Sequence, residues 1–210
     1  MTTIPPPWTR ACWILALTAV WPTAAIAHAD FGAAGADYGW ATGFTHPLRG
    51  PDHILAMVSV GVISARIGGR AIWTVPLAFV AAMAVGGAFG SGLGSTPATT
   101  PWVEFGIALS VVALGAAIAI GSELDPLVAM AFVGLFGLCH GYSHGAEIPV
   151  SATWWPYLTG IVAATAGLHL AGVGIGIGAA RFGLGVAALR LGGAAVAAIG
   201  LGPLLTYYGS

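Results

Sequence analysis

Uncharged apolar runs of about 20 residues recur along most of this chain, and each is long enough to cross a bilayer as an α-helix. Charged residues make up only 6% of the 210 residues. An average soluble domain has about 25%. Inside lipid every backbone polar group must be satisfied within the fold, which runs of this length achieve as helices. The sequence therefore predicts an all-α integral membrane protein.

The runs predict about six transmembrane helices in one polytopic domain over residues 28–210. These spans are expected near residues 37–66, 71–91, 102–121, 126–146, 154–178 and 189–208. The chain has no lysine and a formal net charge of −1, which excludes the basic surface of a nucleic-acid-binding protein. Its first expected partner is the lipid bilayer, and a homo-oligomer is possible.

Residues 1–27 have the pattern of a cleavable signal peptide. Arg10 provides the positive flank, residues 11–20 form a short apolar core, and Ala25-Ile26-Ala27 fits a cleavage site. An uncleaved additional helix is the alternative. Cleavage would leave His28 at the N-terminus, where its amine and imidazole can chelate a metal ion; a solvated polar terminus is the simpler interpretation.

Arginine positions predict the orientation of the helices. A cleaved signal places the mature N-terminus outside, so the loops that contain Arg66, Arg70, Arg181 and Arg190 fall inside. The uncharged loop 92–101 falls outside, in agreement with the positive-inside rule. We therefore expect a multi-pass protein of the inner (cytoplasmic) membrane of a bacterium.

The first polar motif, His46-Pro47-Leu48-Arg49-Gly50-Pro51-Asp52-His53, lies within the first mature span. Gly50-Pro51 predicts a break, with proline at the first position of a second half-helix. Asp52 and His53 then lie in its first turn, near unpaired N–H groups. His46 can approach them only if the intervening turn folds it back. The residues form either metal ligands or a structural hydrogen-bonded cluster.

The second polar motif is Cys139-His140-Gly141-Tyr142-Ser143-His144-Gly145-Ala146-Glu147 in the fourth span. His140, His144 and Glu147 are spaced i, i+4, i+7 and share one face of a helix. Two histidines at i, i+4 chelate metal ions, and the carboxylate can add an oxygen or orient an imidazole. Histidines satisfied by hydrogen bonds near the interface are the alternative.

His169 lies deep in the fifth span. We interpret it as a second station on a metal pathway, with a histidine bonded to a backbone carbonyl as the alternative. Ionisable side chains inside a membrane are costly, so each is a candidate for function. The candidate metal ligands are therefore His28, His46, Asp52, His53, His140, His144, Glu147 and His169.

The two motifs, taken in this order, resemble the signatures of the HupE/UreJ family of nickel/cobalt permeases. The resemblance extends over the whole chain and implies metal uptake for the maturation of nickel enzymes, such as hydrogenase or urease, or for cobalt-dependent pathways. By position, His46, Asp52 and His53 match the first family motif. His140, His144 and Glu147 match the second. Two positions depart from the pattern: Cys139 replaces a common aromatic residue and Ser143 a common alanine. Neither change removes a candidate ligand, so both bear on selectivity more than on activity.

We therefore predict a permease, not an enzyme, for divalent nickel or cobalt, with ligands from the first and fourth mature spans and no prosthetic group. Zinc remains possible, because imidazole and carboxylate suit all three metals. Three alternatives stay open: a membrane zinc metallohydrolase, a haem-binding protein with two axial histidines, and a metal-binding accessory protein that transports nothing.

Overall fold

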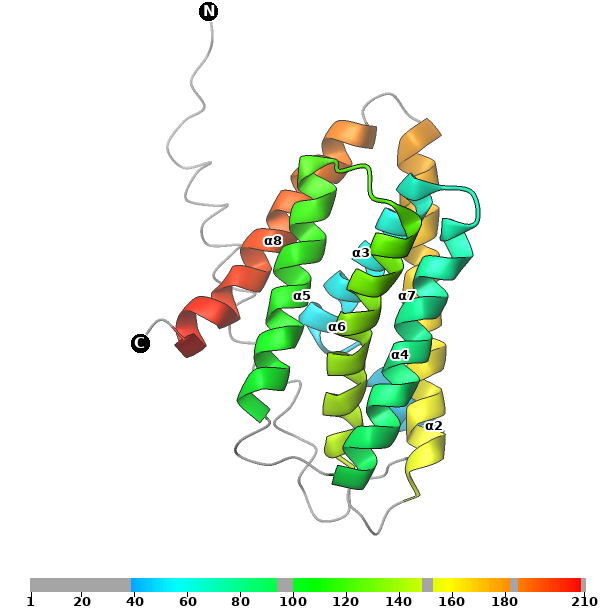
Figure 1. The fold of residues 1–210 in the computed structure, drawn as a ribbon, viewed down its shortest axis with the longest axis vertical. Helices are drawn as coiled ribbons and strands as arrows, with labels where there is room; N and C mark the ends of the chain where they lie inside the picture. The colour runs from blue at the N-terminus through cyan, green and yellow to red at the C-terminus, as the bar shows by residue number, and fades with distance from the viewer. Residues whose placement is uncertain (1–38, 94–99, 149–152, 182–184, 209–210) are drawn as a thin grey trace, which may run out of the picture.

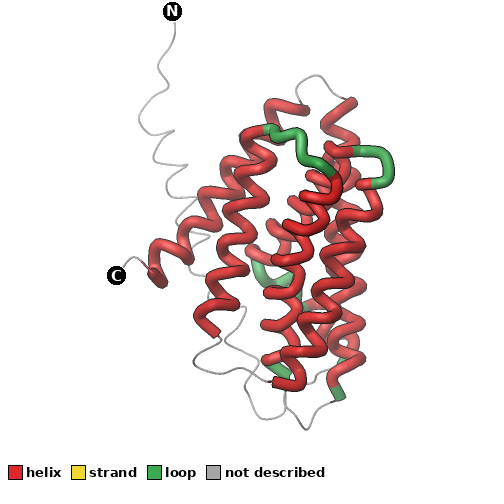
Figure 2. Tube along the Cα trace, in the orientation of Figure 1, coloured by secondary structure: helices red, strands yellow, loops and turns green. Residues whose placement is uncertain are grey.

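The structure is a computed structural model that describes residues 39–93, 100–148, 153–181 and 185–208. The expected signal peptide at residues 1–27 and the candidate ligand His28 lie outside these residues. Every regular element within them is a helix (Figure 2). The helices are α2 (Trp40–Thr45), α3 (Pro51–Ile67), α4 (Ala71–Leu93), α5 (Thr100–Ile120), α6 (Pro126–Ala146), α7 (Trp154–Arg181) and α8 (Gly185–Tyr208).

The described helices α4 to α8 are all long and apolar enough to cross a membrane. They form an elongated bundle with α3 behind α5 and α6 in the view of Figure 1. The prediction of an all-α membrane protein is confirmed at this level. The first expected span, residues 37–66, corresponds to α2 and α3 together, and its crossing of the membrane stays a prediction.

The break in the first span occurs where the sequence predicts it. Gly50 caps α3 in an extended conformation, and Pro51 is its first residue. Asp52 lies in the first turn, where a carboxylate favours the positive end of the helix dipole. A Cβ atom on Gly50 would lie 2.7 Å from Nδ1 of His53 and 2.8 Å from Oδ1 of Asp52. The glycine therefore leaves room for both polar side chains.

Glycines bring α4 and α6 into backbone contact, the most extensive contact between two helices. Gly141 lies against the carbonyl of Met83, and Gly145 against the carbonyl of Gly87, so the two helices run parallel. Small residues allow such close approach in lipid, where van der Waals packing drives helix association. Because α5 lies between α4 and α6 in the sequence, their common direction is the one expected for a chain that crosses the membrane in alternating directions.

A glycine-rich run lies near residue 175. It forms part of α7. Gly172 lies against the carbonyl of Val58, and Gly176 contacts the side chain of Ala65, so one face of the run packs on α3. Gly174 and Gly178 face open space. Close helix packing therefore involves alternate glycines of the run.

The α3–α4 and α5–α6 connections lie at the same end of the bundle (Figure 1). There Arg66 donates from Nη1 to the carbonyl of Ile118, and Arg190 donates to the carbonyls of Ala119 and Ile120. These carbonyls end α5, where helices leave acceptors without partners and the dipole favours cations. This end is the one predicted to face inside; the orientation itself stays a prediction.

Candidate metal centre

Three histidines from three helical segments converge in the bundle. His46 follows α2, His53 lies in the first turn of α3, and His144 lies near the end of α6. They are 2%, 0% and 0% exposed. One ring nitrogen from each lies within 4.8 Å of the other two. The structure therefore brings together residues from both sequence motifs.

The turn between α2 and α3 folds His46 back over the start of α3. Its backbone N–H continues the helix by bonding to the carbonyl of Thr42, and its own carbonyl accepts from the N–H of Arg49. The ring of His46 then lies 5.7 Å from that of His53 and 4.7 Å from that of His144. The folding back that ligation would require is present.

The spacing of the three histidines suits a metal ion after a small adjustment. Metal–nitrogen bonds are about 2.1 Å long, so two donors on one ion lie at most about 4.2 Å apart. The three nitrogens lie within 4.8 Å of one another, slightly wider than this limit. Small ring rotations would close the difference. The set supplies three neutral donors typical of sites for borderline transition metals.

Two of the histidines in the motifs are oriented by a second interaction. Nδ1 of His53 lies 3.0 Å from Oδ2 of Asp52. Nδ1 of His140 donates to the carbonyl of Phe136 at 3.0 Å. Such partners fix the tautomer and leave Nε2 with a lone pair for a metal ion. Asp52 is thus placed to orient His53, and its carboxylate adds negative charge beside the site.

The other predicted ligands of the second motif lie around the three-histidine set but not within it. His140 is fully buried, with its ring 5.5 Å from that of His53. Glu147 is the C-cap of α6, one turn beyond His144. The expected single helical face holds for the two histidines, and Glu147 follows where the helix ends. Neither His140 nor Glu147 belongs to the group of donors within 4.8 Å.

His169 lies in α7, separated from the motif histidines by an aromatic ring. The ring of Phe79 is 5.6 Å from that of His140 and 5.2 Å from that of His169. His169 is 2% exposed, and neither of its ring nitrogens has a hydrogen-bond partner among the described residues. The alternative of a carbonyl-bonded histidine is not observed. Most buried polar side chains form hydrogen bonds, so a buried histidine without one requires an explanation.

Two aromatic residues beside the site were not predicted. Tyr157 is fully buried, with its ring 5.9 Å from that of His46, and Phe79 separates two histidines. A hydroxyl within an apolar span was a signal for Tyr157. Phe79 carried none, because a phenylalanine in an apolar run is ordinary.

A small apolar cavity of about 150 Å³ reaches His144 from the side of α7. Trp154 and Trp155 line it at the start of α7, together with Met83 on α4 and Gly141 on α6. The cavity therefore extends to His144, one member of the three-histidine set. It lies at the end of the bundle opposite Arg66 and Arg190.

Comparison with known proteins agrees with the motifs. A family model described as HupE / UreJ protein matches residues 15–202. Protein HupE of Rhizobium leguminosarum bv. viciae is 44% identical to this chain over 150 residues, which are 71% of this chain and 75% of that protein. No solved structure matches.

Proposed function

The chain belongs to the HupE/UreJ family, and on that premise we propose that it is a permease for divalent nickel or cobalt ions that supplies the maturation of metalloenzymes. The three buried imidazoles of His46, His53 and His144, drawn from both motifs, are the observation that carries this proposal. Three neutral nitrogens beside the Asp52 carboxylate suit a borderline divalent ion better than a hard cation such as magnesium.

The proposed cycle begins when the ion exchanges water for imidazole nitrogens at the three-histidine set. Asp52, with Oδ2 3.0 Å from Nδ1 of His53, would orient that ring and offset part of the charge of the ion. His140 lies beside His53 and is the next donor, while the ring of Phe79 separates it from His169. A shift of this ring would let the ion pass to His169, the second station.

Binding must be strong enough to draw the ion in and weak enough to release it. Protons compete with the metal for imidazole nitrogens, because only the deprotonated ring binds. Uptake should therefore weaken as the pH falls through the range in which histidines take up protons. The carboxylate of Glu147 and the terminal chelate of His28 are proposed as further ligands on the outer side.

The test is uptake of radioactive nickel and cobalt into sealed vesicles that contain the purified protein. Saturable uptake by the unaltered chain and its loss in His53→Ala would support the permease. Cys139→Ala is the matched control, since Cys139 neighbours His140 in sequence but lies against the position of Gly106 on α5; it should transport normally. Tight binding without flux would overturn the proposal in favour of an accessory protein or a metallohydrolase.

A further inference from the structure

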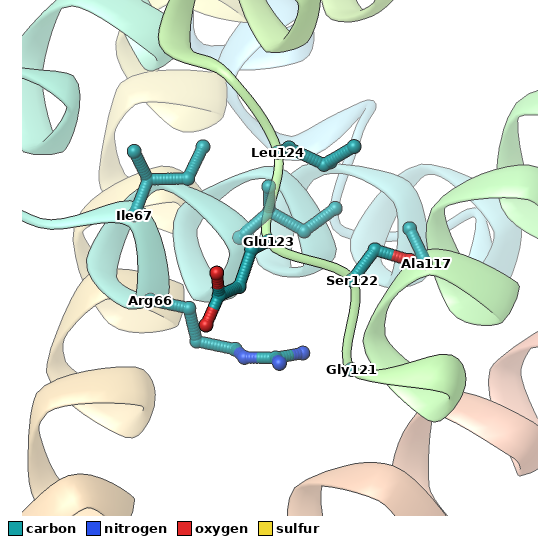
Figure 3. Close-up of a pocket in the computed structure, with 8 residues that line it drawn as sticks. Arg66, Ile67, Ala117, Gly121, Ser122, Glu123 and Leu124 are labelled. Carbon is teal, nitrogen blue, oxygen red and sulfur yellow. The ribbon is translucent and has the colours of Figure 1, made fainter.

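A second polar region lies at the other end of α3, beneath the α5–α6 connection. It is a cavity of about 430 Å³, shown in Figure 3. Its lining residues come from α3, α5 and the connection, and they are Ile63, Arg66, Ile67, Ala117, Gly121, Ser122, Glu123 and Leu124. None of them belongs to the histidine motifs, so the cavity is distinct from the candidate metal centre.

The guanidinium of Arg66 is held in place at this cavity. Its Nη1 donates to the carbonyl of Ile118 at 3.1 Å. Gly121, with a φ of +79°, turns the chain out of α5, and a Cβ there would lie 3.3 Å from Nη2 of Arg66. One N–H of a planar five-donor group is thus committed to the helix end, while others stay available to a ligand.

Glu123 lines the same cavity from the α5–α6 connection, on a wall next to Arg66 (Figure 3). Both side chains are exposed, and in the part of the chain that the structure describes they form no ion pair with each other. Opposite charges therefore share one open cavity without neutralising each other directly. Ser122 adds a hydroxyl, and Ile63, Ile67 and Leu124 supply aliphatic surface.

We propose that this cavity binds the headgroup of a zwitterionic phospholipid that carries a primary ammonium group, such as phosphatidylethanolamine. The phosphate would bind Arg66, since a guanidinium fork matches phosphate oxygens. The ammonium would bind Glu123, and the aliphatic side chains would contact the glycerol and upper acyl chains. Basic pockets between transmembrane helices on the cytoplasmic side bind the phosphates of lipid headgroups in other membrane proteins.

The charges of the cavity disfavour the simpler ligands. A divalent cation would bind Glu123 but would be repelled by the neighbouring guanidinium, and one carboxylate is a weak site for it. An inorganic anion or an anionic headgroup would bind Arg66 but would be repelled by Glu123. A ligand with both charges satisfies both residues, and the cavity lies at the ends of α3 and α5, where we expect the headgroups of the bilayer.

The test is native mass spectrometry of the purified protein with defined lipids, comparing retention of phosphatidylethanolamine, phosphatidylglycerol and phosphatidylcholine. The variants are Glu123→Gln and Arg66→Gln. Arg70→Gln is the matched control, because Arg70 is an exposed arginine close by that does not line the cavity. Circular dichroism of each variant reports whether its helices are intact.

We expect the unaltered protein to retain phosphatidylethanolamine at least fivefold better than the other two lipids. Glu123→Gln should abolish that preference while keeping phosphate binding, Arg66→Gln should lower retention of all three lipids, and Arg70→Gln should change nothing. Equal retention in the unaltered protein, or a preference that survives Glu123→Gln, would overturn the proposal. Soluble phosphoethanolamine that competes as well as the lipid itself would overturn the assignment to lipid.

Discussion

The two ends of α3 hold polar side chains in opposite surroundings. Asp52 and His53 in its first turn lie among α2, α6 and α7, where His53 is fully buried. Arg66 in its last turn is exposed beside an open cavity of about 430 Å³. The two ends are about 20 Å apart at 1.5 Å per residue. Only the first end buries its histidine fully and brings several donor nitrogens together.

The difference comes from how closely the neighbouring helices approach. Around the histidines, α6 contacts the backbone of α4 through Gly141 and Gly145. At the arginine end, α3 and α5 are separated by an open cavity, which Arg66 and the non-helical α5–α6 connection line. Where the surrounding helices pack closely, the polar residues of this protein form a candidate ion site. Where the helices stay apart, the polar residues line a surface cavity.

The largest expected effect comes from separating α4 and α6 beside the histidines, at the end of the bundle that we call the closed end. Gly141→Ala should destabilise the protein by about 3 kcal/mol, because the new Cβ would overlap the carbonyl of Met83. Thermal unfolding in detergent measures this change. Gly174→Ala is the control, since Gly174 faces open space on α7 and alanine favours a helix. Equal stability of both variants would show that α4 and α6 can separate freely.

Removing one of the three donors should nearly abolish metal binding while leaving the fold intact. His144→Ala is expected to weaken nickel binding by at least about 100-fold, more than the loss of a residue that only orients a ligand. Isothermal titration at neutral pH measures the affinity. Arg66→Gln, at the other end of α3, should bind nickel as the unaltered protein does. If both variants behave alike, the ion does not bind at the closed end.

Removing the group that orients His53 should have a smaller effect. Asp52→Asn keeps a partner for Nδ1 of His53 but loses the negative charge, so nickel affinity should fall about 10-fold to 100-fold. The same titration provides the measurement. An affinity unchanged from that of the unaltered chain would limit the role of Asp52 to a favourable charge in the first turn of α3.

His169 should affect transport more than binding. It lies beyond Phe79 and outside the three-histidine set. We expect His169→Ala to keep the affinity of the centre and to slow vesicle uptake about 10-fold, a barrier increase of about 1.4 kcal/mol. Comparing titration with initial uptake rates separates the two quantities. Loss of affinity with unchanged flux would place His169 within the first site.

The smallest effect is expected at the open end of the bundle, where Arg66 and Arg190 lie. Arg190→Gln removes hydrogen bonds to the carbonyls of Ala119 and Ile120 in an exposed position, at a cost of about 1 kcal/mol or less. Thermal unfolding should detect a small decrease, with nickel affinity unchanged. A fall in affinity in this variant would mean that the two ends of the bundle are coupled.

The sequence by itself determined the helices and the character of the site. Apolar runs predicted the helices over α4 to α8 to within a few residues, and Gly50-Pro51 predicted the break before α3. These features depend on local chemistry: hydrocarbon length, the missing N–H of proline, and the helical period that aligned His140 with His144. Each can be recognised without knowing which helices are neighbours.

Only the tertiary structure decided which polar residues meet. Helical period fixes the direction of a side chain on its own helix but not what it faces, because glycine contacts between distant segments set the neighbours. This is why His46 joins His53 and His144, why His140 and Glu147 lie outside that closest set, and why Arg66 and Glu123 share a cavity. The packing of distant helices turned a pattern of histidines into a candidate site.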